Sequence, residues 1–329
     1  FQEKTGGEYS ANDVEVVKQF LYHALQSKSL AKYKVALCFI CINPPYWEFI
    51  AKATEGTKKF FLPGHNVDYF VWSDLPNNPE VTKQKLAEEY LKTGQAKTSV
   101  INSSSQAILM DENKLKDLEK SIGDLVKVRK EVNFFEIESV EWPLPTLFRY
   151  NLFLQQEEKL KDYDYIFYCD IDMLFVNFVG DEILGEGLTA AVHPMYALRS
   201  NFNAPYEPNP KSTAYIPFYN TYFAGGFQGG KSGEFLKAMK AMRSTIDLDF
   251  ERNNYIARWN DESHWNKYLK ENPPSVILSP AYIYPDSLIQ EYYIKIWGRN
   301  YSPKIITLTK KFTVNAQGAA AIQEQLKTL

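Results

Sequence analysis

YDYIFYCDIDMLFV, residues 163–176, is the most strand-like stretch of the chain, and it carries two aspartates one residue apart. Its apolar run up to Cys169 is typical of a strand that is buried on both faces of a sheet. Residues i and i+2 of a strand share a face, so Asp170 and Asp172 are predicted to converge where this strand leaves the sheet. A pair of hard oxygen donors that includes no histidine or cysteine ligand favours Mg²⁺ or Mn²⁺ over zinc. Acids in this arrangement also cap turns or pair with surface lysines, so the pair alone leaves both interpretations open.

Strand patterns and helical patterns alternate along the rest of the chain. KVALCFICI (34–42) is a continuous apolar run, and VDYFVWSD (67–74) is a second strand that ends in an acid. A helical period from residue 47 to 61 separates them, as expected of parallel strands joined by crossover helices. Further strands are predicted at 133–139, 188–194 and 275–284, and further helices at 147–163, 233–250 and 261–272. The order predicts an α/β fold.

The same alternation predicts the domain organisation. A helical pattern over residues 12–30 indicates an N-terminal lead-in helix within residues 1–33, followed by one large domain over residues 34–290. Residues 291–329 are predicted to form a C-terminal appendage. The polar segment 77–130 is predicted to be a surface insertion with variable structure rather than part of the core.

The bulk composition excludes some classes of partner. The net charge is −3, so the chain has no overall basic field for a phosphate backbone, and nucleic acid is not a predicted partner. Cys38, Cys41 and Cys169 all lie in apolar runs, which favours core packing over disulfide, redox or zinc roles. No stretch reaches the ~18 apolar residues that a membrane span needs.

Two further stretches contain residues suited to a binding site. AGGFQGG (224–230) is too rich in glycine for a comfortable strand, and its backbone can approach a ligand closely. In RWNDESHWNKYL (258–269), helical spacing brings Asp261, Trp265 and Tyr268 together, whereas Glu262 and His264 face elsewhere. A solvated helix start, with acids that favour the helix dipole, is the plainer interpretation of this second stretch.

Four segments, taken in order, resemble glycosyltransferase family 6, which includes the histo-blood group A and B transferases and α1,3-galactosyltransferase. They are FYCDIDMLF, AVHP with AYIP (214–217), AGGFQGG, and WNDESHWNKYL with VILSP (276–280). The likeness runs from about Lys34 to about Tyr284, except in the polar segment. It implies a GT-A fold, a Rossmann-like mixed sheet flanked by helices in a single large domain. It also implies metal-dependent transfer of galactose or N-acetylgalactosamine from a UDP-sugar to a sugar hydroxyl of a glycan acceptor, with an α1,3-type linkage and retained configuration.

The resemblance also assigns roles to individual residues. Glu262 is implied as the catalytic carboxylate, either a nucleophile or a stabiliser of positive charge at the anomeric carbon. Asp170 and Asp172 are implied as the Mn²⁺ or Mg²⁺ ligands, and His193, Trp259 and Tyr284 as acceptor-binding residues. The implied donor-binding residues are Ile42, Asn43, Tyr46, Arg149, Asp170, Ile171, Asp172, Ala224, Gly225, Gly226 and Asp261.

The chain departs from the family pattern at several points. Asn260 stands where a histidine usually precedes the DES sequence, and the acid after LSP is displaced to Asp286. Gly226 has no side chain on the implied donor wall, which favours UDP-GalNAc over UDP-Gal. A lectin-like module, a UDP-sugar hydrolase and an inverting transferase on the same scaffold stay open as alternatives. The compartment depends on the source: the Golgi lumen for a trimmed eukaryotic fragment, and the cytoplasm for a microbial enzyme.

Overall fold

A computed structural model of the chain describes residues 32–92, 97–102, 105–109, 112–197, 204–217, 221–286 and 303–308. The predicted helix at 12–30 lies outside the described residues, as does most of the predicted C-terminal appendage. No helix of the described part is both long and apolar enough to span a membrane.

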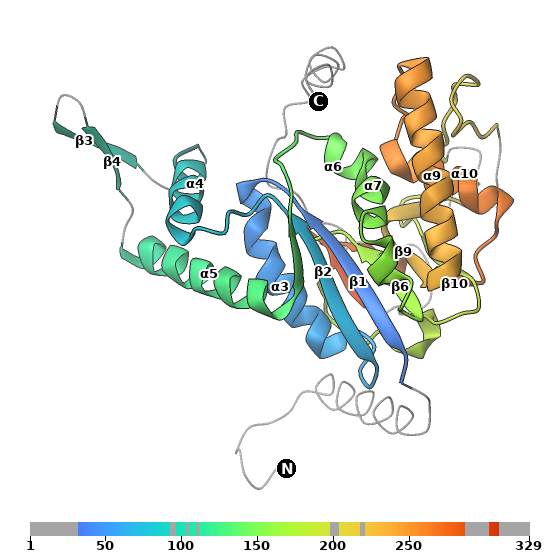
Figure 1. The fold of residues 1–329 in the computed structure, drawn as a ribbon, viewed down its shortest axis with the longest axis horizontal. Coiled ribbons are helices and arrows are strands. Elements are labelled where there is room, and N and C mark those ends of the chain that lie inside the picture. Colours follow the sequence, from blue (N-terminus) through green and yellow to red (C-terminus); the bar gives the residue numbers. More distant parts are fainter. Residues whose placement is uncertain are drawn as a thin grey trace, which may run out of the picture.

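One mixed sheet of seven strands runs through the centre of the molecule (Figure 1), in the order β10-β8-β9-β6-β1-β2-β5. Strand β9 is antiparallel to both of its neighbours, and every other neighbouring pair is parallel. The strands are β1 (Lys34–Cys41), β2 (Asn66–Ser73), β5 (Asn133–Glu136), β6 (Tyr165–Cys169), β8 (Leu188–Val192), β9 (Phe223–Lys231) and β10 (Val276–Leu278). The predicted fold class, a single large domain with a mixed sheet between helices, is confirmed.

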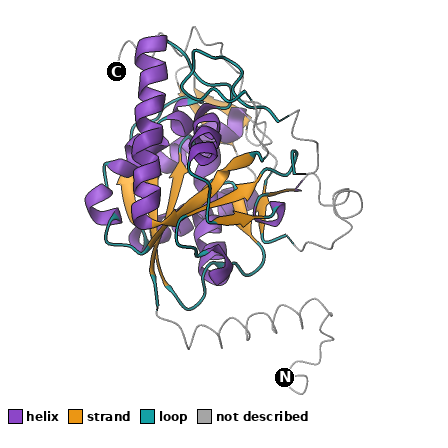
Figure 2. Cartoon of the chain, turned by 90° about the vertical axis from the view of Figure 1, so that its right-hand side faces the viewer, coloured by secondary structure: helices purple, strands orange, loops and turns teal. Residues whose placement is uncertain are grey.

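Strand β1 shows why the sheet is buried on both faces. Val35, Leu37 and Phe39 pack into one apolar core, whereas the residues between them pack into a second core on the opposite face. This alternation follows from the two-residue period of a strand. Helices cover both faces (Figure 2). The three cysteines are buried and free, which confirms the prediction that they pack in the core.

The helices differ from the prediction in two places. Helix α3 (Pro44–Phe60) begins at Pro44, before the predicted start at residue 47, because proline in the first turn of a helix needs no amide hydrogen bond. The single helix predicted at 147–163 is instead three short ones, since hydrogen bonds of three-residue spacing, such as Gln156 N to Phe153 O, interrupt the α-helical pattern. These are α6 (Leu144–Leu147), α7 (Arg149–Leu154) and α8 (Glu157–Leu160).

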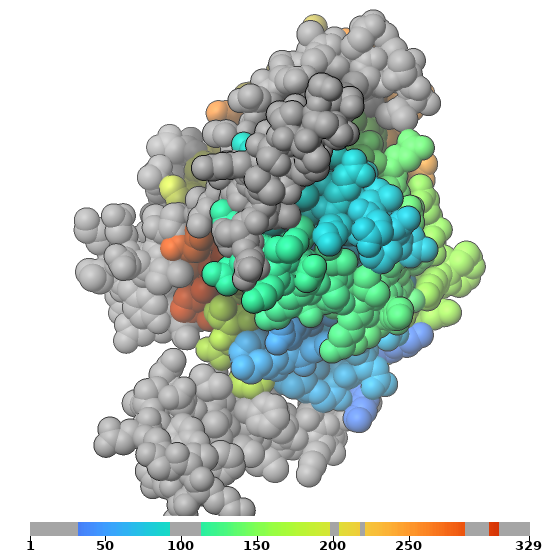
Figure 3. Space-filling view, turned by 90° about the vertical axis from the view of Figure 1, so that its left-hand side faces the viewer, coloured from blue at the N-terminus to red at the C-terminus, as the bar shows by residue number. Residues whose placement is uncertain are grey.

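The polar segment 77–130 is more ordered than its composition predicts. It forms α4 (Pro79–Lys92), a hairpin of β3 (Lys97–Asn102) and β4 (Ser105–Leu109), and α5 (Glu112–Glu131). Leu118 and Leu125 of α5 are buried in the core beside α3. Figure 3 shows α4 and α5 at the surface of the molecule. Because Leu118 and Leu125 nevertheless reach the core, the prediction that the segment lies outside the core is wrong for α5.

The stretch around the two aspartates is not one strand. Strand β6 ends at Cys169, residues 170–172 form a turn, and β7 (Met173–Phe175) enters a second, three-stranded sheet with β11 (Tyr284–Pro285) and β12 (Ile305–Thr307). Asp170 and Asp172 therefore do not lie on one face of a strand; the turn places them. Strand β12 comes from the predicted C-terminal appendage and pairs antiparallel with β7.

AGGFQGG is a central strand, contrary to the prediction. Gly229 and Gly230 of β9 allow close packing, because a Cβ on Gly229 would lie 2.4 Å from the Ile166 carbonyl oxygen and one on Gly230 would lie 2.3 Å from that of Gly187. Gly230 also has a φ of +138°, which side chains rarely permit. The glycines therefore serve strand packing in this part of β9. Two long helices, α9 (Ser232–Asn253) and α10 (Asn260–Glu271), follow it.

Candidate active site

The sheet register gathers the predicted site residues at one edge. Cys41 pairs with Ser73, Cys169 with Phe227, and Val192 with Phe223. Strand β9 runs in the opposite direction to its neighbours. Its first residues therefore lie at the same edge of the sheet as the residues that follow β1, β2, β6 and β8. Ligands of open α/β sheets bind at this carboxyl edge of the parallel strands.

Asp170 is held to β9 by its backbone and to Tyr168 of β6 by its side chain. Its N–H donates to the Gly226 carbonyl at 2.8 Å, and the Tyr168 hydroxyl donates to its Oδ1. A Cβ on Gly226 would lie 2.7 Å from Asp170 Oδ2 and 3.1 Å from Ile283 Cδ1. The space that this glycine leaves is thus occupied by Asp170 and Ile283, so the expected extra room on the donor wall is absent at this Cβ position.

Arg149 links the two acidic segments of the site. Its side chain is buried, its Nε lies 3.1 Å from Asp261 Oδ2, and its Nη1 lies 3.8 Å from Asp170 Oδ1. The same Nη1 donates to the Gly225 carbonyl at 3.2 Å. Its guanidinium carbon is 4.2 Å from the centre of the Tyr168 ring. One buried cation therefore orders α10, β9 and the turn after β6.

Glu262 has a fixed carboxylate. The Tyr222 hydroxyl donates to its Oε1 at 2.6 Å, and the Gly225 N–H donates to its Oε2 at 2.7 Å. Glu262 lies in the first turn of α10, where the helix dipole favours a negative charge. Asn260, the first residue of the helix, has a φ of +48°, which asparagine tolerates better than most residues do.

Burial changes the titration of both neighbouring acids. It raises the pKa of Asp261 to about 7, although the Arg149 guanidinium opposes this shift. It also raises the pKa of Glu262, against the hydrogen bonds from Tyr222 and Gly225. A carboxylate with two fixed donors and a raised pKa is suited to act as a base, a nucleophile or an electrostatic stabiliser.

His193 lies on the same side of the site as Tyr222. Its N–H donates to the Tyr222 carbonyl at 2.9 Å, and its ring centre lies 5.6 Å from that of Tyr222 and 5.0 Å from that of Tyr196. The Met195 N–H donates to Nδ1 of His193, so the neutral ring carries its proton on Nε2. Burial lowers the pKa of His193 to about 4, which keeps the ring neutral near pH 7.

The other predicted residues belong to neighbouring segments, and the Trp259 carbonyl accepts from the Glu262 N–H at 2.9 Å. Trp259, 46% exposed, precedes α10, and Tyr284 is buried in β11. The segment that follows β1 is held by Asp74, which accepts from the Asn43 N–H at 3.0 Å and from Trp47 Nε1 at 2.8 Å. Ile42 directly follows β1, and Tyr46 lies in the first turn of α3. Strand β1 pairs with β6, which precedes Asp170.

Three supporting residues were not identified from the sequence. Tyr222 contacts Glu262 as described above, and the buried Gln228 donates to the Gly225 carbonyl at 2.8 Å. The Asn266 amide exchanges two 2.8 Å hydrogen bonds with the backbone of Phe223 and also donates to the Glu262 carbonyl. Asn266 follows Glu262 by four residues on one helix face, and that spacing was the available signal.

The donor set at Asp170 and Asp172 fits a hard divalent cation. Both supply oxygen ligands, Asp172 is buried and Asp170 is partly exposed. Within the described residues, no group of three His, Cys, Asp or Glu side chains is arranged to hold a metal by itself. Two carboxylates match an ion that completes its coordination with substrate phosphates and water, as Mg²⁺ commonly does.

Comparison with known proteins identifies the relatives of the chain. The model of glycosyltransferase family 6 matches residues 125–304, more than half of the chain. Globoside alpha-1,3-N-acetylgalactosaminyltransferase 1 of Gallus gallus is 28% identical over 243 residues, which cover 73% of this chain and 59% of the relative. Histo-blood group ABO system transferase 1 of Rattus norvegicus is 40% identical over 128 residues, 38% of this chain and 36% of the relative. O-antigen biosynthesis glycosyltransferase WbnI of Escherichia coli is 29% identical over 183 residues, which cover 55% of this chain and 74% of the relative. The chain thus spans between 36% and 59% of the length of the first two relatives.

Proposed function

Because this chain belongs to glycosyltransferase family 6, we propose that it is a hexosyltransferase that moves N-acetylgalactosamine or galactose from a UDP-sugar to a sugar hydroxyl of a glycan. The linkage in this proposal is of the α1,3 type, and the α configuration of the donor is retained. The names of the relatives, an alpha-1,3-N-acetylgalactosaminyltransferase and an ABO transferase, support it. The observation that carries the proposal is the Glu262 carboxylate, fixed by Tyr222 and Gly225 beside the buried Arg149.

The catalytic unit in this proposal is residues 34–290. Residues 77–130 form an insertion within it, with α5 packed on the core. The lead-in of residues 1–33 and the appendage of residues 291–329 lie outside the unit, apart from β12, which completes the small sheet behind the turn of Asp170 and Asp172.

Asp170 and Asp172 would hold Mn²⁺ or Mg²⁺ together with the diphosphate of the donor. When bound, such an ion supplies positive charge that stabilises the departing UDP. Arg149 keeps Asp170 in place from the protein side, through the 3.8 Å approach of its Nη1 to Oδ1. Arg149 also pairs with Asp261. Its positive charge offsets the cost of burying Asp261 next to Glu262.

Glu262 acts on the sugar at its anomeric carbon. Retention requires either a double displacement through a carboxylate or departure and attack on the same face through an ion-pair-like state, and Glu262 serves both. Its two oxygens each accept one hydrogen bond, so the carboxylate does not have to reorganise when positive charge develops next to it. The acceptor sugar lies against the side that carries His193 and Trp259, with Tyr284 as a further contact.

The uridine is placed at the end of β1, against Ile42, Asn43 and Tyr46. Ala224 and Gly225 provide the wall beside the donor sugar. The expected preference for UDP-GalNAc over UDP-Gal is not part of this proposal, because the Cβ position of Gly226 is filled by Asp170 and Ile283 and the Ala224 side chain is buried in the core.

A donor screen tests the proposal. UDP-GalNAc and UDP-Gal are each incubated with Mn²⁺ and with a panel of octyl β-galactosides and β-N-acetylgalactosaminides, and UDP release and glycoside products are followed. Transfer with an α anomeric signal by NMR is expected, and EDTA is expected to abolish it. Hydrolysis without glycosyl transfer, or a β product, would replace the proposal with a hydrolase or an inverting transferase.

A further inference from the structure

Glu207 is a buried acid that the proposed chemistry does not use. Its side chain is inaccessible to solvent, and no lysine, arginine or histidine of the described part of the chain forms an ion pair with it. A buried carboxylate is costly unless hydrogen bonds compensate for the lost hydration. The donors that compensate Glu207 therefore show what it holds in place.

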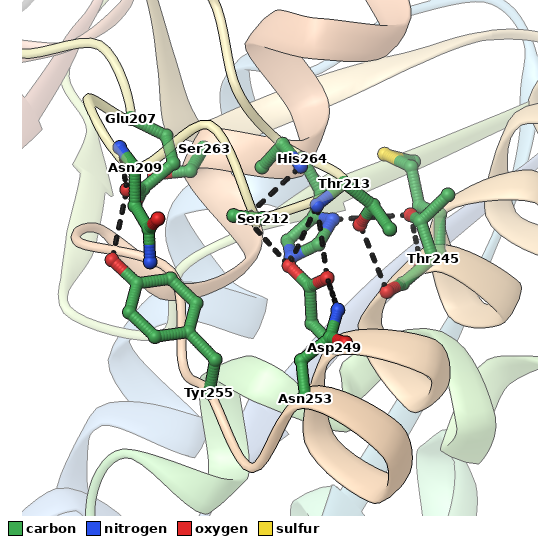
Figure 4. A network of polar contacts seen from close by, with 12 residues as sticks. Glu207, Asn209, Ser212, Thr213, Thr245, Asp249, Asn253, Tyr255, Ser263 and His264 are labelled. Carbon is green, nitrogen blue, oxygen red and sulfur yellow. Dashed lines mark hydrogen bonds and ion pairs between the residues drawn. The ribbon is translucent and has the colours of Figure 1, made fainter.

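Two of these donors come from the connection between α9 and α10. The Arg258 N–H donates to Glu207 Oε2 at 2.6 Å, and the Tyr255 hydroxyl donates to Oε1 at 2.8 Å. Figure 4 shows Tyr255 beside Glu207. Arg258 immediately precedes Trp259, and Glu262 follows three residues later. The carboxylate thus fixes the backbone at the entry to the helix that carries the catalytic acid.

The side chain of Tyr206 and the backbone of Glu207 contact a second group of residues at the site. Tyr206, the preceding residue, packs edge-to-face on Tyr222 with ring centres 5.3 Å apart. The Ile216 N–H donates to the Glu207 carbonyl at 3.3 Å, and Ile216 is buried in the same small cluster as Tyr206 and Tyr222. Tyr222 in turn donates to Glu262 and contacts His193. Glu207 is therefore linked to two groups of residues beside Glu262. One wall is formed by Trp259, which follows Arg258, and the other by Tyr206, Tyr222 and His193.

We propose that Glu207 is a positioning residue for the acceptor, which fixes Trp259 on one wall and the Tyr206–Tyr222–His193 wall on the other at a set separation across Glu262. This inference rests on the proposed transferase function and adds to it a residue that touches no substrate. The binding of UDP and the metal, at the turn of Asp170 and Asp172, does not depend on Glu207.

Asp249 provides a matched control within the same network (Figure 4). It is also a buried acid, and it accepts from the Ser212 hydroxyl at 2.5 Å, from the Thr213 N–H at 2.9 Å and from Asn253 Nδ2 at 3.1 Å. It ties the same loop to α9, and its Oδ2 lies 3.9 Å from Nε2 of His264 in α10, but its side chain makes no bond to the residues just before Trp259 among those described. Loss of its charge should loosen the loop without separating the two walls.

The test compares Glu207→Gln with Asp249→Asn. A glutamine keeps the shape of the side chain but replaces one acceptor oxygen with an amide that can only donate. A backbone N–H therefore loses its acceptor, either that of Asn209 at Oε1 or that of Arg258 at Oε2. We expect the KM for the best octyl glycoside of the panel to rise about tenfold or more in Glu207→Gln. UDP affinity with Mn²⁺, measured by calorimetry, and donor hydrolysis in the absence of acceptor should stay within about twofold of the wild type.

Tyr255→Phe removes a single donor from Glu207 and should give a smaller rise in acceptor KM, which keeps the inference testable if Glu207→Gln does not fold. An unchanged acceptor KM in a folded Glu207→Gln, or in Tyr255→Phe when Glu207→Gln does not fold, overturns the inference. An equal rise in Asp249→Asn, or an equal loss of UDP affinity in Glu207→Gln, would reduce Glu207 to a purely structural role. Failure of the wild type to transfer sugar at all overturns the proposed function itself, which is a separate result.

Discussion

The Tyr222 hydroxyl lies 2.6 Å from Glu262 Oε1 and donates a hydrogen bond to it. The two residues come from segments 40 positions apart, one just before β9 and one in the first turn of α10. The carboxylate is therefore aimed by a side chain outside the motif that contains it. Its orientation depends on the packing of Tyr222 against His193, Tyr196 and Tyr206.

Tyr222→Phe should lower kcat by about 10- to 100-fold, because one fixed donor to the proposed catalytic carboxylate, Glu262, is lost while the ring and its packing remain. The hydrogen bond from Tyr222 lowers the pKa of Glu262, so its removal should raise that pKa further. The acid limb of the kcat/KM profile should then move to higher pH. UDP affinity, measured by calorimetry, serves as the control and should not change; an unaltered pH profile with full kcat would contradict the prediction.

Asp172→Asn should abolish the increase in UDP affinity that Mn²⁺ produces, since one of the two carboxylates that would bind the ion becomes neutral. Calorimetric titration of UDP with and without Mn²⁺ measures the effect. Asp162→Asn is the matched surface control, because Asp162 is an exposed acid in the turn before β6. Equal metal-dependent UDP affinity in wild type and Asp172→Asn would remove the metal from this site.

His264 should make the protein less stable as the pH falls from about 6.5 to about 4. Burial lowers the pKa of His264 to about 4, although Asp249 lies 3.9 Å away and opposes the shift. Between these two pH values the unfolded chain binds more protons, so the free energy of unfolding rises with pH across the window. Its contribution is complete above about pH 6.5 and amounts to about 3 kcal/mol.

Urea unfolding of wild type and His264→Gln over this pH range checks the prediction. The difference between their free energies of unfolding should shrink as the pH falls, because the variant lacks the titrating ring. His193 also has a pKa lowered by burial and contributes a similar slope to both proteins, so it cancels. Parallel curves for the two proteins would show that His264 is not buried in its neutral form.

Gly229→Ala should destabilise the fold by about 1–3 kcal/mol or more, because the new methyl group meets the Ile166 carbonyl at 2.4 Å and the backbone of Phe167 at 2.8 Å. Gly233→Ala is the control: its Cβ has open space in α9, and alanine favours a helix. Thermal unfolding distinguishes them. If both variants melt together, the close packing of β9 between β6 and β8 is not a constraint on this strand.

The strands that carry their own pattern were predictable from sequence. The apolar runs of β1 and β6 predicted the sheet, because burial on both faces leaves only apolar residues in the strands. The acids that follow β6 predicted which edge of the sheet carries the candidate site. Strand β9 was not predictable in this way. Its glycines oppose strand formation locally, and only the close backbones of β6 and β8, which are distant in sequence, favour them there.

Residues of the candidate site were predictable from sequence where they belong to a short motif. They were not predictable where their partners come from elsewhere in the chain. Glu262 and Asp170 belong to short motifs, whereas Tyr222 lies outside them, and the role of Gln228, although it lies within AGGFQGG, follows only from its contact with Gly225. Helix α5 illustrates the same limit: its surface is strongly charged, yet Leu118 and Leu125 reach the core on one helical stripe.

The reversed direction of β9 has a consequence for how specificity can change. Because β8 and β9 are antiparallel neighbours, the connection between them leaves the sheet at His193 and returns at Tyr222 on the same margin. Exposed residues of the described part of that excursion, such as Pro208 and Lys211, can be exchanged while the buried Glu207 and both ends of the excursion keep their contacts. We therefore expect these exposed positions to be where a change of the proposed acceptor can be accommodated without altering the register of the sheet or the proposed nucleotide site.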